Sequence, residues 1–214
     1  MRDAGCQMIF FGAESGNDEV LQQMNKGGKQ SGKQILEFAA RMKKFGIIPE
    51  YSFVLGTPAD SPEKVIDQID KDIAFIKKVK AINPDTEIII YVYSPVPVEG
   101  SELFDTALGT GFSFPTKLEE WLNPEWQQHD LRKTPMAPWL TRKMVQKILD
   151  FDTVLHGRFP TKSDFHITPL QRGLLKLTAG IRYHTNLMAY PYEIKAMQRF
   201  WRYTQPEIAG FYQE

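Results

Sequence analysis

The sequence predicts an α/β fold made of three parallel strand–helix units, followed by a mostly helical C-terminal part. Three runs, at residues 7–13, 51–55 and 87–93, are rich in apolar, β-branched and aromatic residues and have the length of strands. Each run is followed by a turn that contains glycine or proline, and then by a helical pattern. Because strands that alternate with helices pair in parallel, we expect one parallel sheet covered by helices.

The first unit consists of the strand at 7–13 and two helices. Asn17 or Asp18 is predicted to cap a short helix that ends at Met24, because either side chain accepts a hydrogen bond from a free N–H of the first turn. The second helix spans residues 31–45, where apolar residues recur at helical spacing. Gly46 is expected to end it, since glycine readily adopts the left-handed conformation at a helix end.

The second unit begins with the strand at 51–55, and a strong helix start follows it. Ser61 supplies a capping hydroxyl, Pro62 suits the first helical position and Glu63 is favoured there by the helix dipole. The third unit is the strand at 87–93 and a short helix that Ser101 caps. Three parallel strands do not close a barrel and leave an open sheet edge. We therefore expect the sheet to be completed by an N-terminal part absent from this chain, or by a partner.

Residues 109–214 have a different texture. Residues 109–140 are loop-like and rich in proline and tryptophan, and three helices are predicted after them. In the second of these helices, the inward-facing stripe is predicted at Leu170, Leu174, Leu177 and Ile181. The sequence thus predicts two domains, residues 1–108 and residues 109–214.

Composition excludes several classes of protein. Lys+Arg and Asp+Glu both number 26, which gives no electrostatic case for binding nucleic acid or an anionic membrane. No apolar run is long enough to span a membrane, and the N-terminus has no secretory pattern. The one cysteine, Cys6, is expected to be a small buried residue and fits a reducing cytoplasm. The four histidines show no metal-ligand spacing.

Two strand ends carry candidate binding groups. Glu14 falls at the end of the first strand, where its carboxylate can accept hydrogen bonds from a ribose hydroxyl or an ammonium group. Ser15 adds a hydroxyl, and Gly12 allows the backbone to approach a ligand closely. Gly56 begins the turn after the second strand, ahead of a helix N-terminus. Taken alone, both motifs are also compatible with plain turns and helix caps.

Together these motifs resemble the back half of the barrel of radical S-adenosylmethionine (SAM) enzymes. The string from Phe11 to Leu21 with Lys26-Gly27, the Gly56-Thr57-Pro58 turn, and the stretch from Pro95 to Phe104 resemble that family's fourth-, fifth- and sixth-strand motifs in order. The second motif departs from the family pattern, because Ala59-Asp60-Ser61 stands where the family has Gly-Glu-Thr.

The resemblance implies a fold and a site. Residues 1–108 would form strands four to six of an incomplete (β/α) partial TIM barrel. The residues that would line SAM are Gly12, Glu14, Ser15, Gly56, Thr57 and Pro58. The residues that would face SAM or a small-molecule substrate are Tyr91, Tyr93 and Ser94. No catalytic residue and no metal ligand is assigned.

The family binds a [4Fe–4S] cluster through a C-x-x-x-C-x-x-C motif, and this motif is absent from the chain. The resemblance therefore implies a fragment of a radical SAM oxidoreductase or methyltransferase that is inactive alone, with the cluster held only by a full-length parent. The C-terminal half resembles the cobalamin-binding group of the family through Trp121, Arg182 and Tyr190-Pro191, which leaves cobalamin open for that parent.

Two other interpretations remain. The chain is alternatively a non-catalytic SAM- or ligand-binding subunit, or a homo-oligomeric module, without an iron–sulfur cluster. A third interpretation is a remnant without function, which predicts aggregation or a molten state. The substrate and the reaction subtype stay open at this point.

Overall fold

The computed structural model gives the fold of most of the chain. The described residues are 1–24, 30–95, 102–127, 136–161 and 167–201. They divide into two compact units, Met1–Val145 and Gln146–Glu214, and each unit is described by itself. Residues 109–145 group with the first unit, whereas the domain boundary predicted after residue 108 rests on sequence texture and stays a prediction.

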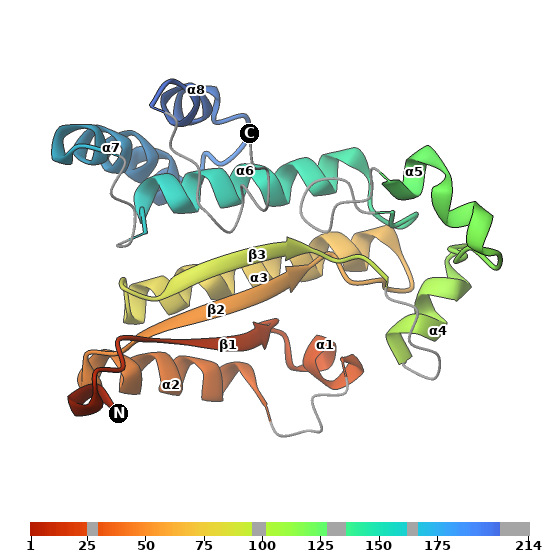
Figure 1. Ribbon diagram of the computed structural model, residues 1–214, viewed down its shortest axis with the longest axis horizontal. Coiled ribbons are helices and arrows are strands. Elements are labelled where there is room, and N and C mark those ends of the chain that lie inside the picture. Colours follow the sequence, from red (N-terminus) through yellow and green to blue (C-terminus); the bar gives the residue numbers. More distant parts are fainter. Residues whose placement is uncertain (25–29, 96–101, 128–135, 162–166, 202–214) are drawn as a thin grey trace. The chain divides into compact units, whose positions relative to one another are not determined.

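The first unit contains an open parallel sheet. Its strands are β1 (Met8–Glu14), β2 (Ile48–Leu55) and β3 (Glu87–Val92), in the spatial order β1-β2-β3. Figure 1 shows the three arrows pointing the same way, and both neighbouring pairs are parallel. The predicted α/β class and the three parallel units are confirmed.

Three helices belong to this sheet: α1 (Asp18–Gln23), α2 (Gly32–Phe45) and α3 (Pro62–Ile82). Helices α2 and α3 run along one face of the sheet (Figure 1). The predicted caps are confirmed at Asn17 and Ser61, whose side chains each accept a hydrogen bond from a backbone N–H of the first turn. Ser31 caps α2 in the same way, which was not predicted. Gly46 ends α2 with a φ of 65°, as its position after the last apolar residue predicts.

The core of the unit lies between the sheet and its helices. Tyr51, Phe53 and Leu55 occupy every second position of β2, so their side chains point to the same face of the sheet. Each of the three is at most 2% exposed. Phe53 packs edge-on against Tyr51 and against Phe75 of α3. Ile69 and Ile76 bring the apolar stripe of α3 into the same core.

Strand β1 lies at one end of the strand order and carries exposed apolar side chains. Phe10 is 55% exposed and Met8 is 39% exposed. A natural sheet edge is usually covered, short or charged, so exposed apolar residues on an end strand are unusual. The expected N-terminal half or partner that would cover this edge stays a prediction.

The remaining part of the first unit is built from short helices: α4 (Glu102–Gly109), a 3₁₀ helix (Leu118–Leu122) and α5 (Pro124–Gln127). Part of the third motif, residues 96–101, lies outside the described residues, as does the Lys26-Gly27 pair of the first motif.

The second unit contains α7 (Pro169–Thr185), α8 (Tyr192–Phe200) and most of α6 (Arg142–Arg158). Asp150, 2% exposed on α6, joins α6 to α8 by accepting hydrogen bonds from the backbone N–H of Tyr190 (2.7 Å) and from Lys195 Nζ (2.8 Å). Arg182 of α7 pairs with Glu193 of α8. None of the described helices is long and apolar enough to cross a membrane.

The predicted inward face of α7 is wrong. The exposed fractions of its predicted stripe run from 46% to 73%, for Leu174, Ile181, Leu177 and Leu170. The buried residues lie on the opposite face and include Leu175 and Ala179. A Cβ placed on Gly157 of α6 would lie 2.8 Å from the Ala179 Cβ, so the two helices approach closely at small side chains. Close packing of small residues therefore selects this face over the one with larger apolar side chains.

Candidate functional site

The predicted binding residues follow three parallel strands. The three strands run in one direction (Figure 1). Glu14 ends β1, and Gly56 and Tyr93 directly follow β2 and β3, so all three residues stand at the same carboxyl edge of the sheet. In open α/β sheets this edge is where ligands bind. The topology thus brings the first and second motifs and the end of β3 to one side of the sheet.

Glu14 has an unusual backbone conformation. Its φ is 61°, in the left-handed region, and the pairing of β1 with β2 is irregular between Gly12 and Glu14. A left-handed non-glycine residue costs about 1–3 kcal/mol and persists only where its surroundings fix it. Such strain clusters at functional positions, and here it falls on the carboxylate that the sequence predicts as a ligand group.

The residues after Glu14 are anchored to α3 through Asp72. The Ser15 hydroxyl donates to Asp72 Oδ1 at 2.7 Å, and the Gly16 N–H donates to the same oxygen at 2.8 Å. Ser15 Oγ in turn accepts from the Asn17 N–H at 3.0 Å. Ser15 is fully buried, so these bonds hold the turn in place, and its role as a SAM contact stays a prediction.

Asp72 is a buried acid that the sequence prediction missed. Its side chain is 2% exposed, and this burial raises its pKa from 3.8 to about 6, against the opposing effect of the hydrogen bonds from Ser15 and Gly16. A signal was present: Asp72 occupies the i+3 position from Ile69 and the i−4 position from Ile76 on the buried stripe of α3. An acid on such a stripe requires a polar partner nearby.

Gln30 is a second residue that the sequence prediction missed. Its side-chain amide donates to the carbonyls of Gly12 (3.1 Å) and Ala13 (3.0 Å). These bonds occupy two backbone acceptors just before Glu14, and they help to fix the irregular end of β1.

The Gly56-Thr57-Pro58 turn is buried by its own chain. The Trp139 indole N–H donates to the Gly56 carbonyl at 2.9 Å, and the Thr57 hydroxyl donates to Gln68 Oε1 at 3.2 Å. Gly56 has a φ of 84°, and a Cβ there would lie 2.8 Å from a methyl group of Leu140. Glycine is therefore required for the backbone conformation and also for the packing of Leu140.

Replacing Trp139 by phenylalanine is expected to lower the free energy of unfolding by about 1–2 kcal/mol, because the buried Gly56 carbonyl loses its donor while most of the ring area stays. Urea titration measures the effect. Trp121→Phe is the control, since the Trp121 side chain is 39% exposed, and it should cost less. Equal costs for the two variants would contradict a specific contribution from the Gly56 hydrogen bond.

The residues predicted to face substrate differ in accessibility. Tyr91 is half-buried, whereas Tyr93 and Ser94 are buried. Burial raises the pKa of Tyr93 to about 12. The Tyr93 ring packs against Trp139, with the ring centroids 5.9 Å apart. The end of β3 is thus linked to the Gly56 turn through the same tryptophan.

Cys6 is half-exposed, so the prediction that it is buried is wrong. Its thiol faces the Met8 carbonyl, with 3.8 Å between Sγ and O. A [4Fe–4S] cluster takes several thiolate ligands, and the chain has one cysteine, so its residues do not fit that cluster. In the described part of the chain, no group of three or more His, Cys, Asp or Glu side chains is placed to hold a metal ion. His129 and His166 lie outside the described residues.

Comparison with known proteins gives a partial similarity. Over 79 residues, the chain is 32% identical to an uncharacterized methyltransferase of Pyrococcus horikoshii. The matched stretch is 37% of this chain and 16% of that relative, so the match covers only a small part of the relative's length. No model of a known protein family matches the chain.

Proposed function

We propose that this chain supplies part of the SAM site of a SAM-dependent methyltransferase of the radical SAM type. The strained Glu14 at the carboxyl edge of a parallel sheet is the observation that carries the proposal. The partial similarity to a methyltransferase supports the SAM-dependent part of it. The order of the strand-end motifs supports the radical SAM type and the partial TIM barrel.

In this proposal each residue near Glu14 has a separate task. The Glu14 carboxylate accepts hydrogen bonds from the ribose hydroxyls of SAM, and Gly12 lets the ligand approach the backbone. Ser15 and Asp72 hold the turn, so that the carboxylate stays at the edge of the sheet. SAM, when bound, supplies the transferable methyl group. The small-molecule substrate would lie toward Tyr91, Tyr93 and Ser94.

One observation favours a second candidate, a ligand-binding module without catalysis. Trp139 already occupies the Gly56 carbonyl, and the turn from Gly56 to Pro58 is buried. In this second reading Glu14 contacts the ligand, while Gly56, Thr57 and Pro58 serve packing. The cluster and any cobalamin belong to other polypeptide segments in the first reading and have no role in the second.

SAM binding to the chain tests the role of Glu14. Isothermal titration of SAM is expected to give a measurable affinity that falls by at least about tenfold in Glu14→Asn, because charge-assisted hydrogen bonds to a carboxylate are worth about 1.5–3 kcal/mol. Asparagine adopts the left-handed conformation readily, so the backbone is kept while the charge is lost.

Glu63→Gln is the matched control, because Glu63 is exposed in the first turn of α3 and its loss should leave SAM affinity unchanged. Absence of SAM binding to the folded wild-type chain would contradict the reading in which this chain alone is a SAM-binding module. SAM binding with equal affinity in the Glu14→Asn variant would place the ligand elsewhere.

A further inference from the structure

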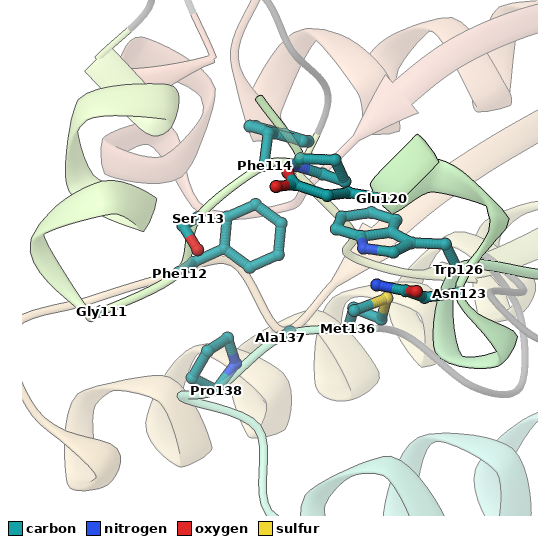
Figure 2. A pocket seen from close by; sticks show the side chains of 11 residues that line it. Gly111, Phe112, Ser113, Phe114, Glu120, Asn123, Trp126, Met136, Ala137 and Pro138 are labelled. Atoms are coloured by element: carbon teal, nitrogen blue, oxygen red, sulfur yellow. The ribbon is translucent and has the colours of Figure 1, made fainter. Parts of the chain in front are cut away.

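A pocket of about 690 Å³ lies in the first unit, outside the strand-end site. Figure 2 shows its lining side chains, which come from the segment after α4, the 3₁₀ helix, α5 and the residues before α6. Its described lining residues are Gly111, Phe112, Ser113, Phe114, Pro115, Glu120, Asn123, Trp126, Met136, Ala137 and Pro138. The volume is in the range of small-molecule sites.

Three aromatic rings form an apolar wall of this pocket. The Phe112 ring meets Phe114 at 84°, with centroids 4.7 Å apart, and meets Trp126 at 73°, with centroids 6.2 Å apart. Phe114 and Trp126 are nearly parallel, with an interplanar angle of 26°. Phe112 thus packs edge to face on the stacked pair Phe114 and Trp126, and the three rings form one aromatic wall of the pocket. Aromatic faces carry negative charge density and attract cations.

The charge of the pocket favours the same kind of ligand. Among the lining residues that the structure describes, Glu120 is the one with a charged side chain. Its Oε2 accepts hydrogen bonds from the backbone N–H groups of Thr116 (2.7 Å) and Lys117 (3.3 Å), which fixes the carboxylate in position. A carboxylate has about four acceptor sites, so it can also pair with a ligand cation. Asn123 adds an amide.

We propose that this pocket binds an organic cation, namely a small substituted ammonium group with apolar substituents. The rings would contact those substituents, and Glu120 would balance the charge. A bare divalent cation fits less well, because Ca²⁺ and Mg²⁺ need several oxygen ligands and the walls are aromatic. The binding of this cation does not rest on the proposed function.

The site also connects to the strand-end site within the first unit. The Phe112 and Trp139 rings pack together with their centroids 6.5 Å apart, and the Trp139 indole N–H donates to the Gly56 carbonyl. A ligand in the pocket would therefore be separated from Trp139 by the Phe112 ring alone.

Choline and its uncharged isostere 3,3-dimethylbutan-1-ol test the proposal, because the two probes differ in charge and hardly in shape. Titrations of the whole chain without SAM, followed by calorimetry or ligand-detected NMR, are expected to show choline binding at least about tenfold tighter than the alcohol. In Glu120→Gln the preference for choline is expected to fall by about tenfold. Glutamine keeps a side-chain oxygen that can accept from the N–H groups of Thr116 and Lys117.

Glu119→Gln is the matched control, since it removes one charge from the same 3₁₀ helix at an exposed residue that does not line the pocket. Its preference for choline should equal that of the wild type. Equal affinity for the two probes in the wild type, or no choline binding, would overturn the proposal. SAM is absent from these titrations, so they do not depend on whether SAM binds at the strand-end site. The two proposals can therefore fail independently.

Discussion

Replacing Gly16 by alanine is expected to lower the free energy of unfolding by roughly 3 kcal/mol, the cost of overpacking a well-filled core. A Cβ at this position would lie 2.0 Å from Cγ of Phe75 and 2.5 Å from its Cβ, distances that real atoms do not adopt. The Phe75 ring is 8% exposed and packs on Phe53, so it cannot move aside without displacing the core. The Gly16 N–H would also be pulled away from Asp72.

Urea titration of Gly16→Ala measures this cost, and the same substitution at Gly173 is the control. Gly173 lies within α7, and a Cβ there would meet nothing within 4 Å, so alanine should stabilise the protein by about 0.5–1 kcal/mol. Combining Gly16→Ala with Phe75→Ala should cost less than the two single changes added together, because the second change removes the Cγ that the new Cβ would meet at 2.0 Å. A loss of unfolding free energy below about 0.5 kcal/mol for Gly16→Ala would show that Phe75 can move aside without disturbing the core.

Raising the pH from about 4 to 7 is expected to destabilise the protein through Asp72. In the folded chain its pKa is about 6, raised from 3.8 by burial, so the folded state holds this proton more tightly than the unfolded state. The stabilising contribution is fully present below the unfolded pKa and is lost as the pH rises through the folded pKa. A shift of this size corresponds to a contribution on the order of 3 kcal/mol.

The Asp72→Asn variant isolates this contribution. Asparagine keeps an oxygen that can accept from Ser15 and Gly16 but does not ionise, so the fall in unfolding free energy between pH 4 and pH 7 should be smaller than in the wild type. Asp67→Asn is the control, because the Asp67 side chain is 59% exposed and pairs with Lys71 on the surface. If the difference in stability between wild type and Asp72→Asn is the same at every pH, Asp72 does not titrate as its burial implies.

The elements of the sheet could be predicted because their signals are local. The alternating apolar residues of β2, the cap at Ser61 and the glycine at position 46 each act within a few neighbours along the chain. The three parallel strands and the helices α2 and α3 follow from such signals. Gly56 has a left-handed backbone in the turn after β2, whereas the ligand role predicted for the motif glycines stays a prediction.

The contacts that shape the site could not be predicted, because they join distant parts of the chain. Ser15 and Asp72 are 57 residues apart, and Gly56 and Trp139 are 83 residues apart. Nothing in a local pattern says which buried hydroxyl meets which buried acid. The face that α7 buries was missed for a related reason, since the helix carries two apolar stripes and the close approach at Gly157 decides between them.

Because Glu14 has a left-handed backbone, selection for stability and selection for ligand binding should favour different residues at position 14. Glycine and asparagine adopt this conformation at lower cost than glutamate, so a library screened only for heat resistance should become enriched in those two residues at position 14. Under the proposed role of Glu14 in binding SAM, a library screened for SAM binding should keep glutamate there. The two libraries would diverge at this position, as expected where stability is sacrificed for binding.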